Sequence, residues 1–251
     1  MKAFFSSLLL CSLFLIYNSS YCQVPAIVGQ NIFKWNVSAV AISHYSFQYE
    51  RVLGLNRSYA IGFGFSPEVS LPFKKDLLKE FGDNEDARSA IESTKFTKIT
   101  VTPEFRFYIN KNAPKGFYIA PFVRYTHMSI KQTYPFITIN GVQHYVDMKG
   151  KFDGVGAGTL IGTQWTLGEV VTLDLWIAGP FIGYMNANFH GTDDMSDMTL
   201  ADKGELKVDI ESTDLPFWTV EATIGNNTVD AKLKGPFVGL RLAGFCVGFR
   251  F

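Results

Sequence analysis

His127 and Ser129 are the residues whose types and spacing come nearest to a catalytic pair. They lie in the segment Thr126–Ile130, which reads THMSI. Residues two apart share one face of a β-strand, so the imidazole could take the hydroxyl proton and make the serine a nucleophile. Such a pair also needs an acid that orients the histidine, and the sequence assigns none. The strand phase places this pair on the outward face of the sheet. A histidine and a serine at the rim there, without catalysis, is the simpler interpretation.

Charged residues alternate with apolar ones in several segments that have the pattern of strands. They are Lys34, Arg106, Arg124 and Arg241, with Glu50, Glu104 and Asp174. If they share the inner face of a closed sheet, each needs a partner of opposite sign, because an unpaired charge out of water is costly. We expect a network of salt bridges that holds the interior shut. A gated narrow pore is the alternative.

No cofactor or metal site is expected. Gly154, Gly156 and Gly158 alternate along a strand with no helix after them, so they do not form a nucleotide-binding loop. The acidic cluster of Asp193, Asp194 and Asp197 does not have the spacing of a calcium-binding loop.

Eight segments alternate apolar and polar residues with the period of a β-strand. They are Ile32–Ile42, Tyr45–Leu53, Ser58–Ser66, Lys98–Ile109, Phe117–Ile130, Phe152–Leu167, Val170–Ala187 and Gly235–Phe251. Repeated alternation and an even strand number are typical of membrane barrels, of which eight strands is the smallest size. The sequence therefore predicts an all-β fold, an eight-stranded antiparallel up-and-down transmembrane barrel.

The connections between these segments alternate in length. Residues 54–57, 110–116 and 168–169 are short turns, whereas 71–97, 131–151 and 188–234 are long and polar. Short periplasmic turns and long extracellular loops are the asymmetry of outer-membrane barrels. Turns of helix are expected in the first long loop, around 76–81 and 85–91.

Alternation alone does not say which face is inside, so a soluble lipocalin-type barrel is the rival fold. The faces opposite the aromatic residues carry glycine, alanine and serine, for example Gly62, Gly64 and Ala60. Such small, uncharged residues are a poor exterior in water but suit the crowded interior of an eight-stranded barrel. We therefore expect the apolar face to contact lipid.

The composition agrees with an exported membrane protein. Aromatic residues make up 15% of the 251 residues and charged residues 18%, and the 23 basic and 23 acidic residues leave no basic surface for nucleic acid. Residues 1–22, with Lys2 before an apolar run, read as a signal peptide cleaved before Gln23; a lipoprotein acylated at Cys22 is the alternative. Residues 23–251 then form one domain with Cys246 as its only cysteine.

The C-terminal strand has aromatic residues on one face and ends on one. Phe245, Val247, Phe249 and Phe251 share a face, and the phase of alternation breaks near Ala243 and Gly244. This segment resembles the closing strand of outer-membrane barrels. The resemblance implies that Phe251 is an assembly signal and that the partners are the outer-membrane assembly machinery, outer-membrane lipid and lipopolysaccharide.

Two further segments carry a family resemblance. ISHYSFQYERVLGLNRSYAIGFGFS and TPEFRFYINKNAPKGFYIAPFVRY, with Tyr49–Arg51, Phe105–Tyr108 and Ala113–Tyr118, resemble uncharacterised Gram-negative outer-membrane barrels filed under a domain of unknown function. The shape is similar to that of the small barrels of the outer membrane protein A and X type. His127 and Ser129 resemble the pair of the lipid A deacylase barrels, although Ile130 stands where that resemblance implies an asparagine.

These observations together predict an integral outer-membrane barrel with a packed polar interior. Its expected role is structural or interactive, through its extracellular loops, and it is not expected to be an enzyme. A narrow solute pore and a lipid A-modifying enzyme of deacylase type are the alternatives. The sequence does not identify a partner of the loops.

Overall fold

The computed structural model describes residues 29–71, 73–81, 85–137, 143–195, 198–212 and 217–251. The expected signal peptide, its cleavage site before Gln23 and the alternative of acylation at Cys22 lie outside the described residues.

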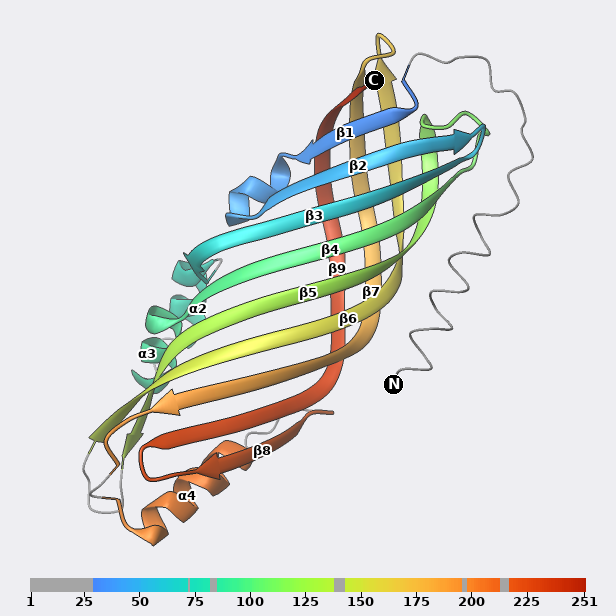
Figure 1. Ribbon diagram of the computed structural model, residues 1–251. Helices are drawn as coiled ribbons and strands as arrows, with labels where there is room; N and C mark the ends of the chain where they lie inside the picture. Colours follow the sequence, from blue (N-terminus) through green and yellow to red (C-terminus); the bar gives the residue numbers. More distant parts are fainter. Residues whose placement is uncertain (1–28, 72, 82–84, 138–142, 196–197, 213–216) are drawn as a thin grey trace, which may run out of the picture.

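Eight antiparallel strands form a closed ring (Figure 1). In chain order they are β1 (Asn31–Asn36), β2 (Tyr45–Gly54), β3 (Arg57–Ser70), β4 (Lys95–Tyr108), β5 (Gly116–Ile137), β6 (Gln143–Leu167), β7 (Val171–Thr192) and β9 (Thr228–Arg250). Each strand pairs with the next, and the ring closes where β1 pairs with β9, with Phe33 opposite Phe249. The all-β, up-and-down, eight-stranded barrel predicted from the alternation is confirmed.

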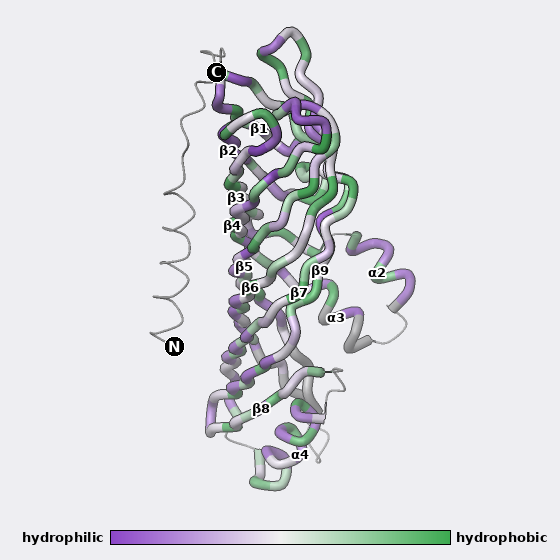
Figure 2. Tube along the Cα trace, turned by 90° about the vertical axis from the view of Figure 1, so that its right-hand side faces the viewer, coloured by the Kyte–Doolittle hydropathy of each residue, from purple (hydrophilic) through white to green (hydrophobic). Residues whose placement is uncertain are grey.

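The outward face of every ring strand carries large apolar side chains that remain exposed. One from each strand, in chain order, is Trp35, Leu53, Phe63, Ile99, Val123, Trp165, Ile182 and Leu240. We call these and the outward apolar residues between them the apolar belt. Figure 2 shows hydrophobic and hydrophilic residues alternating along the strands, as an inside and an outside of opposite character require.

Small inward residues let neighbouring strands and inward rings pack closely. A Cβ atom placed on Gly183 would lie 1.9 Å from the carbonyl oxygen of Val155, so only glycine fits at this position. A Cβ atom on Gly239 would likewise lie 2.3 Å from the ring of Phe181. The small inward residues thus leave room for the larger side chains that fill the lumen.

The two ends of the barrel differ as predicted. The turns after β2, β4 and β6 are short, and the C-terminus lies at the same end (Figure 1). The other end carries helices α2 (Lys74–Phe81), α3 (Glu85–Ser93) and α4 (Leu200–Glu211) and strand β8 (Thr219–Ile224). We call the end with the short turns the turn end, and the end with the helices and β8 the loop end. No helix in the described part of the chain is long and apolar enough to cross a bilayer.

The first predicted strand is shorter than expected. Strand β1 ends at Asn36, and Ser38–Ile42 forms a 3-10 helix, η1. The Asn36 side chain stabilises this local structure, because its Oδ1 accepts from the Ser38 hydroxyl at 2.8 Å and from the Ala39 amide at 3.2 Å. Side chains that bond nearby backbone in this way compete with the strand ladder.

Two predicted loops are instead largely strand. Strands β5 and β6 continue their pairing to Ile137 and Gln143, so most of 131–151 belongs to a hairpin. Strands β7 and β9 likewise pair as far as Thr192 and Thr228, and β8 adds to the edge of β9 outside the ring. Alternation continues into the β9 extension, where Val229 and Ala231 are buried on one face, so this part of the predicted loop carried a strand pattern.

The lumen holds an apolar layer as well as a polar one. Its buried members are Tyr108, Tyr118, Ala120, Phe122, Leu160, Trp176, Phe181 and Cys246. The prediction of a packed polar interior is therefore incomplete. A second cluster, of Met195, Met198, Leu206 and Val229, joins α4 to the strands at the loop end.

Candidate functional site

Six of the seven predicted interior charges meet in the lumen. Lys34, Glu50, Glu104, Arg106, Asp174 and Arg241 are each at most 5% exposed. They come from five strands, β1, β2, β4, β7 and β9. Successive side chains of a strand point to opposite faces. The residues on either side of each charge face the belt, so the charge itself faces inward. We call these six residues the lumen network.

Arg106 is the centre of the network. Its guanidinium lies 2.6 Å from Glu104 Oε1, 2.7 Å from Asp174 Oδ2 and 3.3 Å from Glu50 Oε2. The face of the guanidinium stacks on the Tyr118 ring, with 4.3 Å from Cζ to the ring centroid. One cation thus contacts all three buried carboxylates, an arrangement that the planar five-donor group permits.

Lys34 and Arg241 balance the remaining charge. Lys34 Nζ lies 2.8 Å from Asp174 Oδ2 and also pairs with Glu50. Arg241 Nη1 lies 2.9 Å from Glu104 Oε2. Three cations therefore face three carboxylates, which is the balance that a network removed from water requires.

Neutral polar side chains complete the network, and the sequence analysis did not select them. Gln164 Oε1 accepts from Lys34 and Arg106 at 2.7 and 2.9 Å, and Gln48 bonds both Glu104 and Arg106. The hydroxyls of Tyr108 and Tyr118 donate to Glu50 and Asp174, each at 2.7 Å. Their signal was the strand phase: Gln48 and Tyr108 stand two residues from Glu50 and Arg106 and so share their face.

These contacts cross the lumen between strands that are not neighbours. Arg106 on β4 reaches Asp174 on β7, Lys34 on β1 reaches Gln164 on β6, and Arg241 on β9 reaches Glu104 on β4. Beyond this polar layer, Arg241 stacks on the rings of Phe122 and Trp176 at 4.7 and 4.4 Å. The network is thus a set of cross-braces through the barrel.

Arg124 does not join the network. Its Nε donates to Thr102 Oγ1 at 3.2 Å, and its guanidinium lies 5.8 Å from the Phe181 ring centroid. The aromatic layer of Phe122 and Phe181 lies beside it in the lumen. Arg124 thus lies outside the hydrogen-bonded network although it was predicted with the other six, because sequence phase gives the face of a side chain but not its height in the barrel.

His127 and Ser129 lie on the outer wall, as the strand phase predicted. Ser129 Oγ is 3.5 Å from His127 Nε2, and His127 Nδ1 is 2.8 Å from Asp153 Oδ1. Asp153 is the residue that sequence reasoning missed. It stands directly opposite His127 on the neighbouring strand β6, and only the register of β5 with β6 reveals this.

Phe251 follows the end of β9 with its ring exposed at the turn end. Its backbone exchanges two hydrogen bonds with Asn31, at 2.8 and 3.0 Å, and its ring lies 5.4 Å from that of Phe249. The terminal residue thus extends the β1–β9 closure of the ring by one pair.

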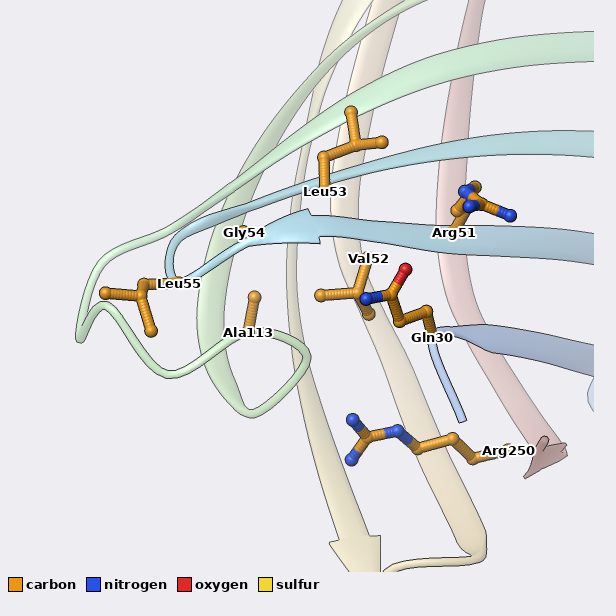
Figure 3. A pocket seen from close by; sticks show the side chains of 8 residues that line it. All are labelled: Gln30, Arg51, Val52, Leu53, Gly54, Leu55, Ala113 and Arg250. Atoms are coloured by element: carbon orange, nitrogen blue, oxygen red, sulfur yellow. The ribbon is translucent and has the colours of Figure 1, made fainter. Parts of the chain in front are cut away.

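A pocket of about 230 Å³ opens at the turn end (Figure 3). Its lining includes Gln30, Arg51 and Arg250 among aliphatic residues, and Arg250 Nε donates to the Gly29 carbonyl. The lining residues contain no carboxylate, histidine or hydroxyl.

Metal-binding groups are sparse in the described residues. Among them, no group of three histidine, cysteine or acidic side chains could hold a metal ion. Asp197, one of the three residues of the acidic cluster, lies outside the described part of the chain.

Solved structures provide two weak likenesses. The structure of Acinetobacter baumannii CarO aligns over 89% of this chain and 98% of that one, with 8% identity and a TM-score of 0.36. The translocator domain of the autotransporter NalP from Neisseria meningitidis aligns over 89% of this chain and 86% of that one, with 10% identity and a TM-score of 0.33. At these TM-scores neither likeness supports a functional argument.

Sequence comparisons place the chain more firmly. No curated protein matches it. One family model, described as "Protein of unknown function (DUF3575)", matches residues 9–206, which is more than half of the chain. The expectation of an uncharacterised family is thereby confirmed, and this chain belongs to the DUF3575 family.

Proposed function

We propose that the protein is an integral outer-membrane barrel with a closed lumen, and that it acts through the elements at its loop end. The apolar belt carries this proposal. Large exposed apolar side chains surround the whole ring, and a soluble protein rarely exposes so continuous an apolar surface. In contact with lipid, these apolar side chains avoid the unfavourable free energy of exposure to water.

Strand length supports the same placement. A strand that crosses a bilayer needs about 9–11 residues. Seven of the eight ring strands, all except β1, contain ten or more residues. We take the membrane-spanning part of each strand to be the part within the belt; on β4, β5 and β6 the belt ends at Ile99, Tyr125 and Val155, next to the outward residues Thr97, His127 and Asp153.

The cross-braces argue against the narrow-pore alternative. A water-filled channel would leave inward charges solvated, whereas the six charges of the lumen network are buried and paired. Opening a path for ions would require several of these pairs to separate at once, and each broken buried pair costs several kcal/mol.

The loop end supports an interaction role. Phe73, Leu200 and Phe217 are 71%, 90% and 91% exposed there. Their side chains stand on or next to α2, α4 and β8, at the end of the barrel opposite the short turns. Exposed apolar residues at that end favour contact with a partner or with lipopolysaccharide above the bilayer.

Cell fractionation combined with surface proteolysis tests the placement. Protease added to whole cells should cut between 193 and 227 and spare 109–115, since the first range lies at the loop end and the second at the turn end. Recovery of the full-length protein in the soluble fraction without detergent would refute the membrane placement.

Planar bilayer recordings test the closed lumen. The purified, folded barrel should insert without steady single-channel steps, because its braces cross the lumen. Reproducible steps of one conductance from pure protein would overturn the closed lumen and favour the pore. That outcome would leave the membrane placement intact.

A further inference from the structure

Three outward side chains on β5 and β6 have the order of a nucleophile, a base and an orienting acid. Ser129 Oγ faces His127 Nε2 at 3.5 Å, and His127 Nδ1 faces Asp153 Oδ1 at 2.8 Å. The carboxylate selects the tautomer in which Nδ1 carries the proton and Nε2 is free to accept from serine. The looser serine contact is in the range found in sites without substrate.

The surroundings hold this arrangement in place. The Tyr125 hydroxyl donates to Asp153 Oδ1 at 2.6 Å, so the carboxylate is fixed from the belt side as well. Both strands are paired without a register shift from Tyr125 and Val155 outwards. Rigid strands position a catalytic set more precisely than loops do.

The position defines what could reach the site. Tyr125 and Val155 of the apolar belt lie on one side of it, and Lys151 and Lys131, of which Lys131 is paired with Glu68, lie on the other. The side chains of His127 and Asp153 are 33% and 48% exposed, so the site is open at the outer wall rather than in the lumen. An amphiphile with an apolar part in the belt and an anionic group near Lys151 fits this position.

We propose that Ser129, His127 and Asp153 form a hydrolytic site for the acyl esters of an anionic amphiphile in the surrounding membrane. Lipopolysaccharide and glycerophospholipid both supply this chemistry. The inference depends on the proposed membrane placement for its substrate, but the chemistry of the three residues does not depend on it. It also goes beyond the structural role, and it reverses the expectation that the protein is not an enzyme.

The reaction uses only the ester and water. Ser129 Oγ attacks the carbonyl carbon while His127 Nε2 takes the hydroxyl proton, and the bond to the alcohol oxygen then breaks as His127 returns that proton to it. Water hydrolyses the acyl-serine in the same way, which releases a fatty acid and restores both residues. Asp153 stabilises the imidazolium and is a positioning residue.

Lys151 is placed to assist. It pairs in register with Ser129 on the neighbouring strand, so its ammonium group is available for the negative charge that develops on the carbonyl oxygen. It can also bind the phosphate or carboxylate of the substrate.

Covalent labelling tests the nucleophile without knowledge of the substrate. The full-length folded barrel in detergent micelles is treated with an alkyl fluorophosphonate, and peptides are analysed by mass spectrometry. We expect label on Ser129, none on the Ser129→Ala variant, and labelling rates lowered about a hundredfold or more in His127→Ala and Asp153→Asn. A serine that labels no faster than in the denatured chain would overturn the proposal.

Two matched controls separate catalysis from folding. Thr133→Ala removes another outward hydroxyl of β5, which donates to Asp147 at 3.0 Å. Asp230→Asn alters a second histidine–aspartate pair, His190 Nδ1 to Asp230 Oδ1 at 2.8 Å, on β7 and β9. Both variants should label as the parent does. Equal losses in Asp153→Asn and Asp230→Asn would show a general effect of surface charge and would count against the site.

Substrate arms then distinguish the lipid sources. The barrel is incubated with lipopolysaccharide, with phosphatidylglycerol vesicles, or with p-nitrophenyl dodecanoate in micelles, and released fatty acid is measured. Asp153→Asn should lower kcat and change its pH profile while leaving KM nearly unchanged, because the carboxylate acts on the imidazole and not on the lipid. Labelling without release from any of the three esters would refute the proposed substrate class. A purely soluble protein that still labels would instead refute the membrane placement alone.

Discussion

Arg106 joins parts of the barrel that are far apart in the chain. Its guanidinium contacts Glu50 on β2, Glu104 on β4 and Asp174 on β7. A buried network of this kind is weak evidence for stability, because desolvation offsets much of the attraction. Removing one member of the network is nevertheless strongly destabilising, since the remaining charges stay buried without a partner.

Removing Arg106 should therefore be far more damaging than removing Arg124. In Arg106→Met we expect the free energy of unfolding to fall by about 3–5 kcal/mol, because three carboxylates then face two cations. Arg124→Met loses one hydrogen bond to Thr102, a change of about 0.5–1.5 kcal/mol. Urea unfolding in detergent micelles, followed by tryptophan fluorescence, measures both. Equal effects of the two substitutions would contradict the central position of Arg106.

His44 should make stability depend on pH. It lies outside the strands between η1 and β2, where burial, and then the positive charges of Lys98 and Arg124, lower its pKa from 6.5 to about 4. The unfolded chain therefore binds this proton more readily than the folded one, so the histidine lowers stability as pH falls from about 6.5 towards 4. Above that window its effect disappears.

The His44→Asn variant isolates this contribution. Urea titrations measure the free energy of unfolding of both proteins. The value for the parent minus the value for the variant should decrease as pH is lowered from 6.5 to 4, since the other titrating groups are common to both. A difference that stays constant across this range would show that the imidazole titrates normally. The Ser66 hydroxyl, 3.0 Å from His44 Nδ1, is unchanged in both.

At the scale of elements, the loop end is added to a barrel that closes without it. In the described residues β8 pairs only with β9, and Ile224 of β8 packs on the cluster that joins Leu206 of α4 to Val229 of β9. The ring itself closes through β1 and β9. The elements of 193–227 are thus dispensable for closure.

A deletion tests this independence. Thr192 and Thr228 are opposite each other in the β7–β9 register, so an Asn-Gly turn that replaces 193–227 should continue the ladder. The shortened chain should still fold in micelles and show the heat-dependent mobility shift of a folded barrel on gel electrophoresis. Deletion of Asn31–Asn36 is the contrasting variant: it removes β1, opens the ring and should abolish the shift. Loss of the shift in both would show that the loop end is needed for folding.

At the scale of the whole molecule, the proposed role of Phe251 as an assembly signal is separable from its part in ring closure. The backbone of Phe251 pairs with Asn31, whereas its ring, 53% exposed, contacts mainly Phe249. Replacement of the ring leaves the backbone pair in place. Folding in vitro and recognition by the assembly machinery should therefore respond differently.

Phe251→Ala should separate these two roles. Refolding into micelles should change little, with a loss of stability below about 1 kcal/mol, since the ring is half exposed. The amount recovered in the outer membrane of expressing cells should fall severalfold. Immunoblots of membrane fractions measure this, with Phe249→Ala as the control that keeps the terminal aromatic residue. Equal recovery of parent and Phe251→Ala would remove the role in assembly.

The sequence by itself determined the fold class, the number of ring strands and the inward face of the charges. Alternation with period two is a local property, and each strand of a barrel buries one face and exposes the other along its whole length. It also placed His127 and Ser129 on the outer wall. The phase break at Ala243 could also be predicted, because alternation is a local property of the sequence. In the structure Ala243 has a φ of 47°, and Leu242 and Ala243 both face outwards.

Only the tertiary structure decided which inward or outward residues meet. Arg106 reaches Asp174 across 68 positions of sequence, Arg124 stays apart from the network, and Asp153 stands beside His127 from 26 positions away. Strand register and height in the barrel fix these neighbours, and both result from pairing over the whole ring. The sequence of one strand does not show which residue of the neighbouring strand will lie opposite it. Asp153, the orienting acid, could therefore be identified only from the pairing of β6 with β5.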